Sequence, residues 1–75
     1  MEANEFAMTE FERLRIEAGL TIAQVCREAE ISRSTVEKIE KDIPVRPPFA
    51  SRACKVLSRH LEREVNYEVI GIKTV

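Results

Sequence analysis

Apolar residues recur along this chain every three to four positions, with polar residues between them. This spacing predicts a series of short amphipathic helices. The first is expected over residues 9–19, with Phe11 at the start of its apolar face. Thr9 and Glu12 have the spacing of a capping box, in which each side chain satisfies a backbone N–H of the first turn. Gly19 is a natural end for this helix, because glycine adopts the left-handed conformation without steric strain.

Two shorter helices are expected directly afterwards, over residues 22–29 and 33–41. Thr21 and Gln24 repeat the capping-box spacing, and Ser32 is a good N-cap for the third helix. Helices of about two turns are marginal in isolation, so these two must be held at a fixed angle by a small shared core.

The loop 42–48 leads into a fourth predicted helix over residues 49–63. Pro47 and Pro48 suit the entry to a helix, since the N–H that proline lacks has no partner in the first turn. The 75 residues of the chain are enough for one small domain with a modest core.

The last segment, residues 66–75, is rich in Val and Ile, is interrupted by Gly71, and is expected to form a short strand. A single strand has no partner in an otherwise helical chain, so its main-chain groups would face water or another chain. We expect antiparallel pairing with a second copy across a two-fold axis, and a disordered tail is the alternative. The expected residues of this dimer strand are Tyr67, Val69, Ile70 and Ile72.

These patterns together predict an all-α fold, a compact four-helix domain with a short C-terminal β-strand. We divide the chain into an acidic N-terminal lead over residues 1–8, a helical domain over residues 9–64, and a dimerisation segment over residues 65–75. The expected oligomer is a homodimer.

Composition narrows the class of protein further. No stretch approaches the roughly 20 apolar residues that a membrane-spanning helix requires. The acidic start of the chain is unlike a secretory signal, so a cytoplasmic protein without a membrane partner is expected. Cys26 and Cys54 lie at apolar positions and are expected to be reduced, buried thiols.

The formal net charge of −1 argues against a strongly basic nucleic-acid-binding protein. The charge is unevenly distributed, however, because the first twelve residues hold four glutamates and no basic residue. The 12 Lys and Arg residues therefore all lie in residues 13–75, against nine acidic residues, which gives that part a net charge of +3. A modest basic face can form there.

Little in the sequence indicates catalysis. His60 is the single histidine and lies late in the fourth predicted helix, where a partial positive charge suits the helix dipole. The spacings of the other reactive side chains match no nucleophile–base pair and no metal site. We expect that the protein is not an enzyme and that it binds no metal, no cofactor and no small-molecule ligand.

Two short helices joined by a tight turn present the first turn of the second helix to solvent. That turn begins here with Ser32, Arg33, Ser34 and Thr35, which are short or cationic hydrogen-bonding residues. The core needs none of them, which favours a role in binding.

The helices also carry a wider pattern. Arg15 lies in the first predicted helix, and Glu40, of opposite charge, lies at the end of the third. The sequence "RPPF" follows as residues 46–49. With these features, residues 11–61 resemble the lambda-repressor-like helix-turn-helix domains, the class that includes phage repressors and Cro proteins. The apolar anchors of that motif match Val25, Ala29, Ile31, Val36 and Ile39.

The resemblance implies binding to double-stranded DNA, with Arg33 and Ser34 at base edges in the major groove and Lys38 further along the helix. Ser32 and Thr35 would contact phosphates or cap the helix. The alternatives are a solvated surface role for Arg33 and a purely helix-starting role for Ser34 and Thr35.

Further phosphate contacts are implied outside that helix. Thr21 would offer its hydroxyl and N–H to a phosphate at a helix N-terminus, where the dipole helps. Arg46 would contact a phosphate or a narrowed minor groove, and Lys41 is a weaker phosphate candidate.

Two residues depart from the family pattern. Glu30 stands where the turn usually has glycine, which costs about 1 kcal/mol in a left-handed conformation. Ile22 stands where a glutamine often contacts phosphate, and an exposed isoleucine would favour a protein surface.

The resemblance therefore implies a sequence-specific transcriptional regulator of the Cro/repressor type (XRE family) that binds a pseudo-palindromic operator as a dimer. The alternatives are a protein-interaction module that keeps the fold without binding DNA, or an antitoxin.

Overall fold

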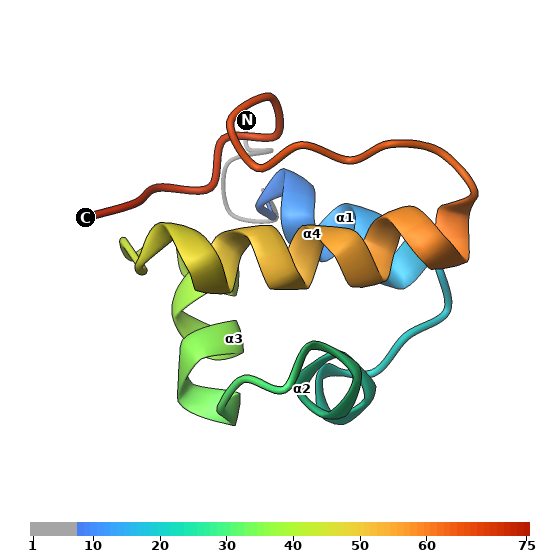
Figure 1. Ribbon diagram of the computed structural model, residues 1–75, viewed down its shortest axis with the longest axis horizontal. Coiled ribbons are helices and arrows are strands. Elements are labelled where there is room, and N and C mark those ends of the chain that lie inside the picture. Colours follow the sequence, from blue (N-terminus) through green and yellow to red (C-terminus); the bar gives the residue numbers. More distant parts are fainter. Residues whose placement is uncertain (1–7) are drawn as a thin grey trace, which may run out of the picture.

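The computed structural model describes residues 8–75, and this part of the chain forms four helices around one core (Figure 1). The helices are α1 (Glu10–Glu17), α2 (Ile22–Ala29), α3 (Arg33–Glu40) and α4 (Pro47–Leu61). Each begins and ends within two residues of the range predicted from the apolar spacing, so the prediction of a four-helix, all-α domain is confirmed. Apart from Met8, the acidic lead predicted over residues 1–8 lies outside the described residues.

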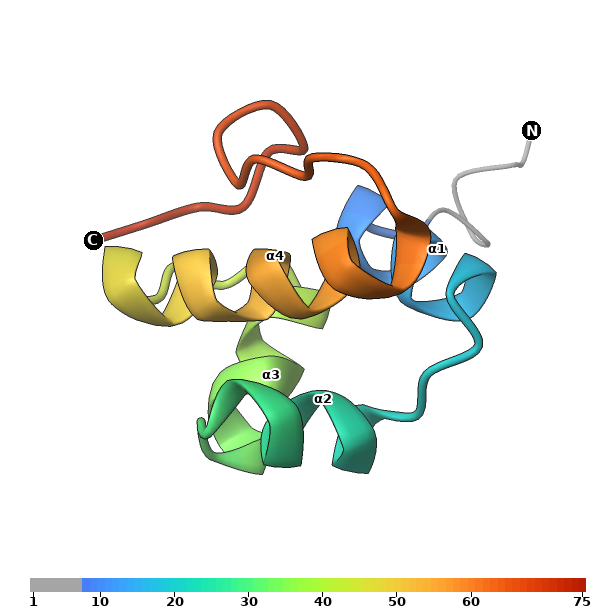
Figure 2. The same cartoon turned by 45° about the vertical axis from the view of Figure 1, so that its right-hand side comes forward.

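α4 is the longest helix and packs against the other three, while α2 and α3 also pack against each other (Figures 1 and 2). The largest fully buried side chains come from all four helices. They are Phe11 of α1, Val25 of α2, Val36 of α3, and Val56 and Leu57 of α4. Because each short helix contributes so few large side chains, none has a core of its own and all depend on α4.

Side-chain caps fix where the two central helices begin. The capping box predicted at Thr21 is complete: its hydroxyl accepts a hydrogen bond from Gln24 N–H (3.1 Å), and Gln24 Oε1 accepts one from Thr21 N–H (2.8 Å). Ser32 caps α3, since its Oγ accepts a 3.1 Å bond from Thr35 N–H. These local bonds satisfy donors that a helix start otherwise leaves unpaired.

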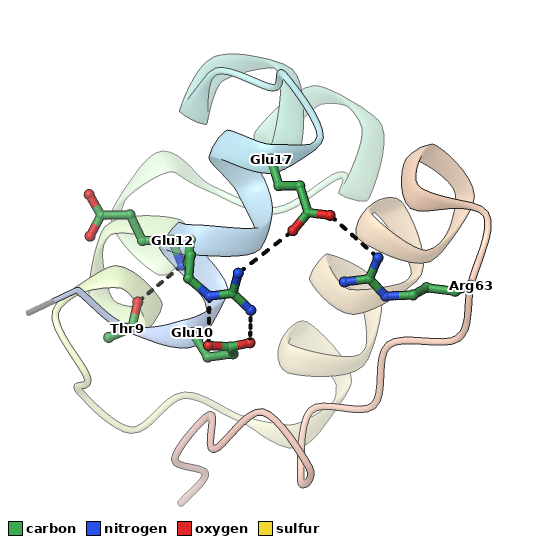
Figure 3. A network of polar contacts seen from close by, with 6 residues as sticks. Thr9, Glu10, Glu12, Glu17 and Arg63 are labelled. Carbon is green, nitrogen blue, oxygen red and sulfur yellow. Dashed lines mark hydrogen bonds and ion pairs between the residues drawn. The ribbon is translucent and has the colours of Figure 1, made fainter.

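α1 is held by polar contacts at its start and along its exposed face (Figure 3). The Thr9 hydroxyl accepts a 3.1 Å bond from Glu12 N–H, which is one half of the capping box predicted there. Arg13 lies 3.7 Å from Glu17, and Arg63 lies 3.4 Å from the same carboxylate. The second pair ties α1 to the segment after α4, although exposed pairs contribute only about 0.2–1 kcal/mol each.

The C-terminal strand predicted from Tyr67, Val69, Ile70 and Ile72 is wrong. Residues 67–71 form turns, and the described residues contain no strand. Three of the four apolar side chains pack partly buried against the core of their own chain, and Val69 alone among them is 83% exposed. The segment therefore does not present the regular edge that antiparallel pairing with a second copy requires.

Local turn contacts and a distant partner explain this difference. The Asn66 side chain accepts a 2.7 Å bond from Glu68 N–H, which starts a turn, and Gly71 has a φ of 83°, outside the range of a strand. Further along, Thr74 forms an isolated parallel bridge with Val45. The segment thus finds its main-chain partner in the loop before α4, and tertiary packing overrides the β propensity of its side chains.

Candidate nucleic-acid interface

α2 and α3 form a helix-turn-helix whose turn is built on a left-handed residue. α2 ends at Ala29, and Glu30 follows with φ 57° and ψ 47°. The Ile31 N–H then donates to the Cys26 carbonyl at 3.2 Å and closes the turn. Glu30 therefore keeps the geometry that glycine would adopt freely, at an energetic cost of about 1 kcal/mol.

The first turn of α3 carries a cluster of hydroxyl groups. Ser32 Oγ lies 2.8 Å from Thr35 Oγ1 and 3.2 Å from Ser34 Oγ. Ser32 and Ser34 are exposed, and Thr35 is half-buried. Ser32 thus hydrogen-bonds to both of the other hydroxyls in the free protein, and the cluster lies at the surface where an outside acceptor can reach it.

Arg33 lies next to this cluster, and its side chain is 64% exposed. Its Nε is 3.1 Å from Glu37 Oε2, one turn further along α3. The sequence prediction left Glu37 out of the site, although the i, i+4 spacing of a basic and an acidic residue is a recognised signal for such a pair. We call the exposed surface of Arg33, Ser34, Glu37 and Lys38 the recognition face.

The start of α2 offers fewer free side-chain groups than predicted. Thr21 is exposed, but its hydroxyl and its N–H are both bonded to Gln24 within the capping box. Ile22 packs half-buried against the core and is not the exposed apolar residue that would favour a protein surface. The remaining N–H groups of the first turn can still donate to a phosphate, where the helix dipole favours an anion.

Cationic side chains flank the loop between α3 and α4. Lys41 is the C-cap of α3, Arg46 is the N-cap of α4, and both are exposed. Arg46 lines a surface hollow of about 240 Å³ together with Thr35 and Lys38 of α3. The structure thus brings three of the predicted contact residues together, between the recognition face and the start of α4.

An ion pair joins α1 to the end of α3. Arg15 Nε lies 2.5 Å from Glu40 Oε2, and its Nη2 donates to Oε1 at 3.3 Å. The third nitrogen, Nη1, donates to the Leu20 carbonyl at 2.8 Å. Because the two side chains are only 13% and 10% exposed, this bidentate contact is well shielded and fixes the position of α3.

A second polar cluster ties α2 to α4. His60 Nε2 lies 2.9 Å from Glu28 Oε1, and Arg59 Nη2 lies 3.3 Å from the same oxygen. The hydrogen bond with His60 is the main cause that lowers the pKa of the Glu28 carboxyl below its ordinary value. These contacts hold α2, the first helix of the helix-turn-helix, against α4.

The remaining reactive side chains of the described residues include two cysteines. Both cysteines are free, and burial raises the pKa of the Cys54 thiol to about 12. Within residues 8–75, no group of three or more His, Cys, Asp and Glu side chains is arranged to hold a metal ion. No helix in that part of the chain has both the length and the apolar character needed to cross a membrane.

Comparison with protein families gives one clear match. The family model described as a helix-turn-helix domain matches residues 9–65, which include all four helices. Comparison with curated proteins and with solved structures found no match.

Proposed function

Because this chain belongs to the helix-turn-helix domain family, we propose that it is a sequence-specific DNA-binding transcriptional regulator. The observation that carries this proposal is the exposed first turn of α3, where Arg33 and Ser34 face solvent. Lys38 follows Ser34 by one helical turn, and together with Arg46 and Thr35 it lines the hollow between α3 and the start of α4. The proposed role is binding, without catalysis.

In the proposed complex α3 lies in the major groove and its first turn meets the base edges. Arg33 is the main residue that recognises the base sequence, because a guanidinium can donate to both O6 and N7 of guanine. Such a contact discriminates against the wrong base by about 1–3 kcal/mol. It must first leave Glu37, which holds it at 3.1 Å in the free protein. An exposed pair of this kind contributes only about 0.2–1 kcal/mol, so guanine competes successfully for the arginine.

Affinity in this proposal comes mainly from the phosphate backbone. Arg46 and Lys41 neutralise phosphates on either side of the loop, and the first turn of α2 at Thr21 receives another. Ser32 and Thr35 donate hydroxyl hydrogen bonds at the edge of the groove. These contacts place α3 in register without reading the sequence.

We further propose that the protein is a Cro- or repressor-type regulator of the XRE class that binds a pseudo-palindromic operator as a homodimer. Two half-sites then lie about 34 Å apart, one turn of the duplex. A C-terminal strand pair does not supply the dimer contact in this proposal, because that segment is folded onto its own chain. Sedimentation of the protein with and without its operator distinguishes a preformed dimer from one that assembles on DNA.

Selection of bound fragments from a random pool of duplex DNA tests the proposed function. A regulator enriches a recurring sequence, and its affinity falls steeply with added salt. Arg33→Ala should weaken binding to the enriched sequence more than to random duplex, whereas Lys41→Ala should weaken both alike. No enrichment, together with no salt-dependent binding to duplex, would favour the protein-interaction module instead.

A further inference from the structure

Residues 72–75, which we call the C-terminal strap, lie along the loop that joins α3 to α4. The Val45 N–H donates to the Lys73 carbonyl at 3.1 Å, and the Val75 N–H donates to the Val45 carbonyl at 3.0 Å. Figures 1 and 2 both show the strap running past the first turn of α4. Val45 is 6% exposed, so the strap satisfies main-chain groups that water reaches poorly.

The strap ends beside the proposed DNA-binding surface. Val75 lines the hollow that Thr35, Lys38 and Arg46 also line, and it is 78% exposed. Packing of its side chain therefore does not explain why the strap crosses the loop at this place. The main-chain bonds to Val45 hold this end of the strap next to Arg46, one of the two cations that face phosphates in our proposal.

One side chain of the strap changes the charge of the loop. Residues 41–46 contain a single carboxylate, Asp42, which stands between the cations Lys41 and Arg46. Lys73 Nζ lies 3.0 Å from Asp42 Oδ2. Without this ammonium group, a phosphate that approaches the loop would meet an uncompensated negative charge at short range.

We propose that Lys73 is a positioning residue of the DNA interface, which neutralises Asp42 and so lets the loop accept a phosphate. This inference rests on the proposed function. The strap's two main-chain bonds hold Val45 in place, and Arg46 follows it directly in the chain. A loop that is already ordered loses less conformational freedom when it binds, which adds to the electrostatic effect.

The test is Lys73→Gln, with Lys55→Gln as the matched control. Both substitutions remove one exposed lysine charge, but Lys55 lies on α4, about two and a half turns beyond Arg46. Lys73→Gln should lower the affinity for the selected duplex and for random duplex about fivefold, and Lys55→Gln less than twofold. The melting temperature should stay unchanged, because Lys73 and Asp42 form an exposed pair.

The double variant Lys73→Gln with Asp42→Asn replaces the ion pair by neutral amides and separates the possible roles. We expect its affinity to return to within about twofold of the wild type. If the double variant binds as weakly as Lys73→Gln, Lys73 contacts the phosphate itself and the neutralising role is refuted.

Two further outcomes distinguish this inference from the function on which it rests. If the wild type binds duplex and Lys73→Gln behaves like Lys55→Gln, only the inference fails. If the wild type binds no duplex even at low salt, the proposed function fails and the inference fails with it.

Discussion

Arg15 of α1 and Glu40 of α3 form a bidentate ion pair that also reaches the Leu20 carbonyl, in the connection between α1 and α2. One guanidinium thus joins α1, the connection that follows it, and the end of α3. The pair contacts α3 at its last turn, whereas the proposed DNA-reading residues lie at its first turn. The orientation of the recognition face therefore depends on a contact made at the opposite end of the same helix.

Removal of one partner of this pair should destabilise the fold. Glu40→Gln should lower the free energy of unfolding in urea by about 2–3 kcal/mol, because it leaves a shielded guanidinium without its counter-ion. Glu10→Gln, which removes the exposed partner of Arg13, should leave the free energy of unfolding almost unchanged. The double variant Arg15→Met with Glu40→Met should be more stable than Arg15→Met alone, and an additive loss would contradict this account.

The left-handed residue in the turn offers a stabilising substitution. Glu30→Gly should raise the free energy of unfolding by about 0.5–1 kcal/mol, because glycine adopts φ 57° without steric strain. Ala23→Gly, in the first turn of α2, should instead lower it by about 1 kcal/mol. Thermal unfolding of both variants measures the difference, and a destabilised Glu30→Gly would show that the turn is not strained.

Glu37 should act on specificity rather than on folding. Glu37→Gln releases Arg33 and removes a negative charge from the recognition face, so the affinity for random duplex should rise about threefold. The ratio of the affinity for the selected duplex to the affinity for random duplex should fall, since an arginine without its ion-pair partner contacts phosphates as readily as guanine. Fluorescence anisotropy with both duplexes measures this ratio. Glu62→Gln, just beyond α4, is the control, and an equal ratio in the two variants would disprove the role.

The Glu28 contact should make stability depend on pH. The pKa of Glu28 is lowered in the folded protein by its hydrogen bond with His60, so the carboxylate binds fewer protons when folded than when unfolded. The stabilisation of the fold by the Glu28 carboxylate is therefore fully present above the ordinary pKa of 4.5. It is lost as the pH falls through the lower pKa that Glu28 has in the folded protein. The melting temperatures of wild type and Glu28→Gln should converge at acidic pH. A difference in melting temperature that persists at acidic pH would contradict this account.

The two thiols should differ in reactivity. Burial raises the pKa of Cys54 to about 12, so at pH 8 almost none of it is the reactive thiolate. Cys26 is only half-buried and should be alkylated first by iodoacetamide in the native protein. Mass spectrometry after limited reaction identifies the modified residue. Equal labelling of both thiols under native conditions would mean that α4 opens readily.

Most of the fold could be predicted because its signals are local. The caps at Thr21 and Ser32, the two prolines before Phe49 and the apolar spacing all act within a few residues of the helix they define. α4 begins at Pro47, two residues earlier than predicted, because a proline can occupy the first helical positions themselves.

The C-terminal segment could not be predicted in the same way. Its β-prone residues favour a strand, but Gly71 bends the chain and the partner of Thr74 is Val45, almost thirty residues away. Local propensity does not reveal a partner at that distance. For the same reason the Asp42–Lys73 pair was not evident from the sequence, whereas the Arg33–Glu37 pair follows from the spacing of neighbours on one helix.

The mutual bonds of Ser32, Ser34 and Thr35 bear on how this protein would search a genome. In the proposed complex, a hydroxyl that exchanges its internal partner for a phosphate gains little free energy, so these hydroxyls would orient α3 on the duplex but add little affinity at wrong sites. If the protein is the proposed regulator, its dwell times at those sites would be short. Prolonged residence then requires a site where Arg33 finds its guanine, and most of the discrimination rests on that one side chain.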